Sequence, residues 1–206
     1  MKWFVQAPLE LLVTVIAYIL NPVIMLFCDE YGWLPHWLYW FQTYDNCLYV
    51  DWMIYEHCVP SWAEYDFNKH YKYHLEQKFD DGRVIAGYVD MLDKNFTLKE
   101  KLQRYVCGLC WLYRNCNYGF SYYVNGRSID STKLVIKEDH CYINDEIFIG
   151  WESSKSLWRT TWCLFYCKKY CKWFRLRIYL GWKLKSKSSG RHMLALHISP
   201  FKPVEN

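Results

Sequence analysis

The sequence Leu11-Leu-Val-Thr-Val-Ile-Ala-Tyr-Ile-Leu-Asn-Pro-Val-Ile-Met-Leu-Phe-Cys28 decides the fold of this chain, because none of its eighteen residues is charged. As a helix it would extend about 27 Å at about 1.5 Å per residue, close to the hydrocarbon thickness of a bilayer. Lys2 is its only basic flank and no Ala-x-Ala-like site follows, so it does not resemble a cleavable secretory signal. Two interpretations follow: the helix spans a membrane, or it is buried in the core of a soluble domain.

Asn21-Pro22 lies inside this run and predicts a kink. Proline has no amide proton, so the helix loses one backbone hydrogen bond. Membrane helices tolerate this loss where a neighbouring group bonds the carbonyl that is set free.

The composition is rich in aromatic side chains, with 12 Trp and 19 Tyr among 206 residues. Such rings suit β-structure and the interfacial belts of membrane proteins. The mean hydropathy of −0.21 allows at most one membrane span. We therefore expect an anchor at residues 1–30, a helical, aromatic-rich part at 31–117 and a β part at 118–206, with 31–206 forming one domain.

Two capping boxes predict helices. Thr97-x-x-Glu100 precedes apolar residues at helical spacing, which predicts a helix to about residue 114. Ser61-x-x-Glu64 predicts a helix over residues 62–78, on which His70 and His74 would share one face.

The second half of the chain has the patterns of strands. Residues 120–124 precede Asn125-Gly126, which favours a tight hairpin. Alternating apolar and polar residues predict a half-buried strand from residue 174 to 184, and further strands are expected at 133–137, 141–143 and 146–151, with a last strand that ends before Pro200. The fold class is therefore α+β. An N-terminal hydrophobic helix, which either spans a membrane or is buried, and a helical part are followed by a C-terminal antiparallel β-sheet.

Positive charge is concentrated in residues 151–206, which hold twelve Lys and Arg and only two acidic residues, Glu152 and Glu205. A basic, aromatic-rich region indicates an anionic partner, either lipid or nucleic acid, or pairing with the acidic first part of the chain. The candidate residues for binding lipid head groups or nucleic-acid phosphates are Lys168, Lys169, Lys172, Arg175, Arg177 and Lys183. Arg175, Arg177 and Lys183 would share one side of their strand with Tyr179.

The ten cysteines do not form the pattern of a disulfide framework. Cys107-x-x-Cys110 has no second matched pair, and the two histidines lack the H-E-x-x-H pattern, so no metal and no cofactor are expected. We expect reduced, buried thiols that pack as small apolar side chains.

A polar cluster in the aromatic first half supplies the only candidate for catalysis. Asp45, Asp51 and His57 would act as acid–base groups, with Arg114 as an anion clamp. The alternative is that Asp45 caps a turn and His57 bonds a backbone carbonyl. The sequence holds no Walker A, G-x-S-x-G or dinucleotide motif, which favours a protein that is not an enzyme.

Several short motifs together resemble a family of small, uncharacterised tailed-bacteriophage proteins with an N-terminal hydrophobic segment. They are the hydrophobic N-terminus, residues 33–41, Asp45-Asn46, Glu56-His57, residues 111–115 with 118–120, residues 180–183 and residues 199–201. Where that pattern has proline after its Asp-Asn and Arg-Asn pairs, this chain has Cys47 and Cys116. The resemblance implies a viral protein made in a bacterium and assigns no mechanism.

The leading hypothesis is a non-enzymatic accessory protein of a tailed phage, held to the host inner membrane by residues 11–28 and binding host or phage components. The alternatives are a hydrolase-like enzyme with the Asp/His/Arg site and a virion component that contacts DNA. Lys2 before the run and Asp29 and Glu30 after it favour a cytoplasmic N-terminus. The rest of the chain would then lie in the periplasm. That compartment is oxidising, so the ten cysteines would be expected to pair there.

Overall fold

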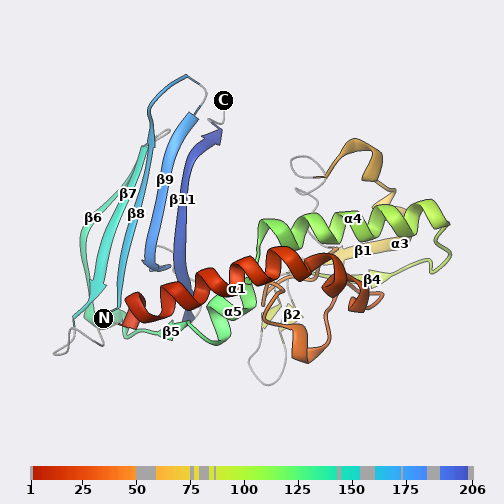
Figure 1. Cartoon of the computed structure of the whole chain (residues 1–206), viewed down its shortest axis with the longest axis horizontal. Helices are drawn as coiled ribbons and strands as arrows, with labels where there is room; N and C mark the ends of the chain where they lie inside the picture. The colour runs from red at the N-terminus through yellow and green to blue at the C-terminus, as the bar shows by residue number, and fades with distance from the viewer. Residues whose placement is uncertain are drawn as a thin grey trace. The chain divides into compact units, whose positions relative to one another are not determined.

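The structure is a computed structural model that describes residues 2–49, 59–74, 77–78, 84–85, 87–142, 145–153, 161–172, 174–184 and 191–203. It confirms the α+β class, with a long apolar N-terminal helix, further helices and a C-terminal antiparallel sheet (Figure 1). The chain forms two compact units. The helical unit comprises residues 13–120, and the sheet unit comprises residues 1–12 and 121–206. Helix α1 (Lys2–Ile24) contributes to both.

The helical unit contains the second half of α1, which tightens into the 3₁₀ turn η1 (Met25–Phe27), and the long helix α4 (Leu98–Arg114). Its short elements are η2 (His36–Leu38), η3 (Ser61–Ala63), α3 (Phe67–His70), β1 (Tyr71–His74), β2 (Gln77–Lys78), β3 (Val84–Ile85) and β4 (Tyr88–Met91). β1 pairs with β4 and β2 with β3, both antiparallel. Met25, Leu34, Leu48 and Leu112 lie in the core of this unit.

Helix α4 begins at the capping box that the sequence predicts. The Thr97 hydroxyl accepts the Glu100 amide at 3.2 Å, and the Glu100 carboxylate accepts the Thr97 amide at 2.7 Å. Further along the helix, a Cβ at Gly108 would collide with Met25. Glycine at this position therefore lets α4 approach the end of α1 closely.

The helix predicted over residues 62–78 is wrong, because among its described residues only those of α3 are α-helical and Tyr71–His74 form β1. Ser61 makes no capping bond, and the cap comes instead from the Asp66 side chain, which accepts the Lys69 amide. Tyr71 and Tyr73 then pair with β4, since their aromatic rings suit a strand. Part of the predicted segment, together with the turn expected at residues 80–82, lies outside the described residues.

The sheet unit is built on five antiparallel strands in the order β11-β9-β8-β7-β6. They are β6 (Leu134–Tyr142), β7 (Asp145–Glu152), β8 (Trp162–Lys169), β9 (Phe174–Trp182) and β11 (Leu194–Pro203). Beside them lie η4 (Ser131–Lys133) and the pair of β5 (Arg127–Ser128) with β10 (Arg191–His192). The strands predicted at 133–137 and 141–143 are one strand, β6.

Two strands depart from the prediction. β8 was not predicted, because Trp162, Leu164 and Tyr166 alternate with Cys163 and Phe165 and leave no polar face to mark a strand. β11 continues past Pro200, and its register with β9 shifts between Ser199 and Lys202. It is an edge strand, where a proline removes no bond from a neighbour.

The strand predicted over residues 120–124 is wrong, because the segment belongs to helix α5 (Tyr118–Tyr123). Arg191 bonds the last carbonyls of this helix, at 2.7 Å from both Tyr122 and Tyr123. Asn125 is buried rather than exposed in a hairpin. Tertiary contacts therefore override the strand propensity of these aromatic residues.

Candidate functional site

The exposed surface of α1 and η1 is apolar along its whole length. Twelve large apolar side chains form this surface, which we call the apolar arc: Phe4, Val5, Leu9, Leu11, Leu12, Val15, Ile16, Ile19, Leu20, Val23, Leu26 and Phe27. At about 100° per residue they cover about 200° of the helix circumference. Leu12 and Ile19 lie near the middle of the arc, and Ile19 is 70% exposed.

Between Trp3 and Ile24, the buried side of α1 carries small and polar residues. Buried side chains recur at intervals of three, four or seven, at Trp3, Ala7, Glu10, Ala17, Asn21 and Ile24. A helix in the core of a soluble protein has the opposite distribution, with its large apolar residues inside. This spacing is readable in the sequence, but the uncharged run alone does not reveal that its small and polar members are the packed ones.

In the helical unit, tyrosine side chains donate hydrogen bonds to backbone carbonyls of α1. The Tyr113 hydroxyl donates to the Tyr18 carbonyl at 3.2 Å, and the Tyr105 hydroxyl donates to the Pro22 carbonyl at 2.7 Å. Tyr18 is four residues before Pro22, so its carbonyl is the one that the proline leaves without a helical donor. The Tyr113 hydroxyl therefore takes the place of the missing helical donor.

In the sheet unit, the buried side of α1 carries a carboxylate. Glu10 is 5% exposed and accepts hydrogen bonds from the Ser121 hydroxyl and from Asn125 Nδ2, the latter at 2.6 Å. The Asn125 carbonyl in turn accepts Trp182 Nε1 at 3.1 Å. Trp3 donates its own indole N–H to the Ala195 carbonyl at 3.3 Å. The Glu10 carboxylate, which directly precedes the uncharged run, is thus hydrogen-bonded inside the protein.

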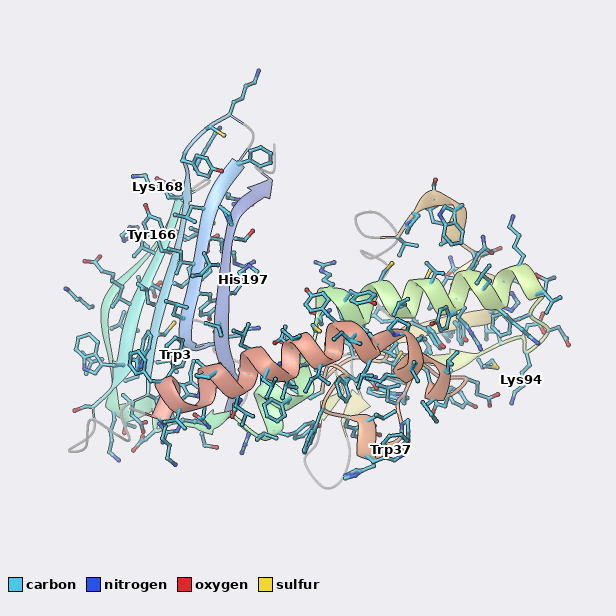
Figure 2. All side chains as sticks on the ribbon, in the orientation of Figure 1. Trp3, Trp37, Lys94, Tyr166, Lys168 and His197 are labelled. Carbon is cyan, nitrogen blue, oxygen red and sulfur yellow. The ribbon has the colours of Figure 1, made fainter. Side chains whose placement is uncertain are left out.

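An exposed tryptophan contacts the end of the apolar arc. Trp37, in η2 (Figure 2), is 66% exposed. Its ring meets the Phe27 ring edge-on at 5.4 Å between centroids. Trp40 is 50% exposed and contacts Phe120. Exposed indole rings beside an apolar surface are typical of the interface between water and lipid.

By length and composition, residues 2–27 could cross a membrane, with a mean hydropathy of 2.1 in the most apolar window. A core helix or a signal sequence would pass the same test. Only 28% of that window is buried, however, so the segment is not enclosed as a core helix would be.

Of the four predicted catalytic residues, the structure describes Asp45 and Arg114. Asp51 and His57 lie outside these residues. The Asp45 carbonyl accepts the Gly87 amide at 3.1 Å, and its carboxylate helps burial to raise the pKa of Tyr118. Arg114 is exposed at the end of α4, with its guanidinium 5.7 Å from the centroid of the Trp111 ring.

The predicted basic face divides into buried and exposed members. Arg175 is 7% exposed and lies on the same side of β9 as the buried Tyr179, so this side is not the outer surface that the alternation predicts. Arg177 stacks its guanidinium 5.6 Å from the Phe165 ring. Lys183 follows the end of β9 and is half-buried. The exposed members are Lys168, Lys169 and Lys172.

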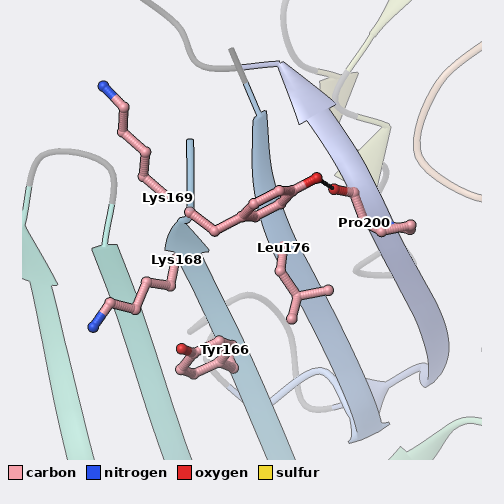
Figure 3. Close-up of a pocket in the computed structure, with 6 residues that line it drawn as sticks. Tyr166, Lys168, Lys169, Leu176 and Pro200 are labelled. Atoms are coloured by element: carbon pink, nitrogen blue, oxygen red, sulfur yellow. Dashed lines mark hydrogen bonds between the residues drawn. The ribbon is translucent and has the colours of Figure 1, made fainter. Parts of the chain in front are cut away.

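A shallow cavity of about 570 Å³ lies at this end of the sheet (Figure 3). It is lined by Tyr166, Lys168, Lys169, Tyr170, Leu176 and Pro200, and Tyr170 donates its hydroxyl to the Pro200 carbonyl at 2.5 Å. The side chains of Lys168 and Lys169 point away from Leu176 and Pro200. The ammonium groups therefore lie at the rim of an apolar floor and do not converge on an anion.

The paired histidines do not form a metal site. His70 is buried, with Nδ1 3.0 Å from the Asp93 carbonyl and Nε2 3.2 Å from Glu100. His74, in β1, bonds Asp90 at 2.8 Å. Within the described part of the chain, no group of three His, Cys, Asp or Glu could hold a metal ion.

Comparison with known proteins gives one result. No curated protein and no solved structure matches the chain. The family of unknown function DUF7338 matches it over residues 1–206. The chain, with its apolar N-terminal helix and its C-terminal sheet, therefore belongs to the family DUF7338.

Proposed function

We propose that this protein is a membrane-attached, non-enzymatic accessory protein that binds a bilayer through α1. The observation that carries the proposal is the inverted helix, with large apolar side chains outside and Ala7, Glu10, Ala17 and Asn21 inside. Twelve exposed apolar side chains in one continuous arc exceed what soluble proteins leave in contact with water. Hydrocarbon is the solvent that such a surface fits.

Two polar groups of α1 are hydrogen-bonded inside the protein, and this also supports contact between α1 and a bilayer. In lipid, each free backbone carbonyl and each unpaired carboxylate is costly, so polar groups of membrane helices face protein and find partners there. The Tyr18 carbonyl and the Glu10 carboxylate both have such partners. The resemblance to small tailed-phage proteins supports a phage origin and, with it, the inner membrane of a host bacterium.

Extraction of membranes at alkaline carbonate tests this proposal. We expect the protein to stay in the membrane fraction and to float with lipid in a density gradient. The double variant Leu12→Glu/Ile19→Glu places two carboxylates in the middle of the apolar arc, and we expect it to move to the soluble fraction. Glutamate is chosen because the longer Lys side chain could reach the head groups.

A matched control is available on α4, where Leu98 is 84% and Leu102 is 55% exposed. The variant Leu98→Glu/Leu102→Glu makes the same chemical change on another helix and should remain with the membrane. Circular dichroism of both variants would establish that each retains its helices. Full recovery of the wild-type protein in the soluble fraction would overturn the proposal.

A further inference from the structure

We infer that α1 lies in the plane of one leaflet, with the N-terminus and the rest of the chain on the same side of the bilayer, instead of crossing it. This inference rests on the proposed function and concerns how the same helix meets lipid. A spanning helix needs about twenty apolar residues inside the hydrocarbon, and any protein packed against those residues enters the hydrocarbon with them.

Each of the two units packs protein against its own part of α1. Near the start, Trp3 bonds the Ala195 carbonyl and its ring lies 5.3 Å from Trp162. In the second half, the Tyr18 ring stacks on Tyr113 at 5.6 Å, and Asn21 Nδ2 donates to Cys116 Sγ at 3.8 Å. Both the start of α1 and the second half of its uncharged run therefore have protein packed against one side.

The packed protein carries charges that hydrocarbon does not accept. Tyr113 lies against Tyr18, in the middle of the uncharged run, and Arg114 follows it as an exposed residue. If α1 crossed the bilayer, this guanidinium would be carried toward the hydrocarbon centre, where an arginine is costly. If α1 lies in the plane, the same guanidinium stays on the water side.

The width of the apolar arc also fits an in-plane helix. Its apolar side chains cover about half of the circumference, and an interfacial helix sinks such a face roughly 5–10 Å into the leaflet. Trp37, which contacts Phe27 at the end of the arc, has the exposure expected at the level of the head groups.

Depth measurements at four positions test the inference. Val5, Leu12, Ile19 and Leu26 are seven residues apart, so they lie on nearly the same face, and all four are exposed. A spin label would be attached to each in turn through a genetically encoded ketone, which avoids the native cysteines. The full-length protein would be bound to vesicles of phosphatidylethanolamine and phosphatidylglycerol, and the accessibility of each label to oxygen and to a polar nickel chelate would be measured.

An in-plane helix gives four similar depths. A spanning helix gives labels at 12 and 19 that lie much deeper than those at 5 and 26, and this result would overturn the inference. In sealed membrane vesicles, tags at the two ends of the chain should be digested together or protected together. Digestion of one tag alone would also overturn it. Absence of any vesicle binding is a different result, which removes the proposed function itself.

Discussion

Tyr113 donates its hydroxyl hydrogen to the carbonyl oxygen of Tyr18 across 3.2 Å, and the two rings stack at 5.6 Å. The usual donor to that carbonyl would be the amide of residue 22, which is proline. Helix α4 therefore supplies the hydrogen bond that α1 cannot make for itself. The carbonyl that the proline leaves without a helical donor is thus bonded by a residue that lies 95 positions beyond Tyr18 in the chain.

This relationship predicts a coupling between Tyr113 and Pro22. Tyr113→Phe removes the hydroxyl and should lower the free energy of unfolding by about 0.5–1.5 kcal/mol. In a Pro22→Ala background the helical amide returns, so the same substitution should cost clearly less. Denaturant unfolding of both single variants and the double variant, in detergent, measures the coupling.

Tyr105 provides the matched control for that cycle. Its hydroxyl donates to the carbonyl of Pro22, a group that Pro22→Ala leaves in place. Tyr105→Phe should therefore cost the same in both backgrounds. An equal cost of Tyr113→Phe in both backgrounds would show that its hydroxyl does not replace the missing amide.

The buried carboxylate of Glu10 gives a second prediction. Glu10→Ala leaves the Ser121 hydroxyl and the Asn125 amide without this acceptor inside the sheet unit, which should cost about 1–3 kcal/mol. Glu10→Gln keeps an oxygen acceptor and should cost less. Thermal unfolding of the two variants would rank them, and an equal loss in both would mean that the negative charge, not the acceptor, is what matters.

The sequence predicts the elements whose signals are local. α4 follows from the Thr97 and Glu100 capping box, and β9 follows from its alternation, because in both cases neighbouring residues determine the structure. The fold class follows from the same signals. The apolar character of α1 is also local, since it depends only on consecutive residues.

The remaining features depend on contacts between distant residues. α5 forms where Ser121 and Asn125, four residues apart, meet a carboxylate from the first turns of the chain. Nothing near residue 121 indicates that partner. The sequence likewise does not show that the small, polar side of α1 is the buried one, because only packing shows which side of a nearly uniform apolar helix faces protein.

Cysteine reactivity supplies a third prediction. Nine cysteines lie in the described residues and all have free thiols. Burial raises the pKa of Cys28 to about 12 and that of Cys116 to about 11, so both are almost entirely protonated at neutral pH. Cys141 is exposed on β6. We expect maleimide to label Cys141 long before Cys28 or Cys116.

Peptide mapping by mass spectrometry after timed labelling measures these rates. A sample unfolded in urea serves as the control, because it removes the protection and should make the three rates similar. Rapid labelling of Cys28 in the folded protein would contradict the packing of the turn that follows η1.

The last prediction concerns Glu100 and the pH dependence of stability. Hydrogen bonds from Lys69 Nζ at 2.8 Å, from the Thr97 amide and hydroxyl, and from His70 hold the pKa of Glu100 well below its usual value. The folded state therefore binds fewer protons than the unfolded chain, and stability rises with pH in this range. The contribution is fully present above the unfolded pKa of about 4.3 and is lost as the pH falls through the lower, folded value.

Glu100→Gln removes this dependence. The difference in unfolding free energy between wild type and Glu100→Gln should be largest at about pH 7 and should shrink steadily as the pH is lowered below about 4. Urea unfolding of both proteins across this range measures it, and Asp139→Asn, which removes an exposed carboxylate from β6 in the sheet unit, controls for the general loss of negative charge. A difference that stays constant with pH would show that Glu100 acts through its shape and its capping bonds alone, because only the ionised carboxylate gives the helix start a contribution that protons can remove.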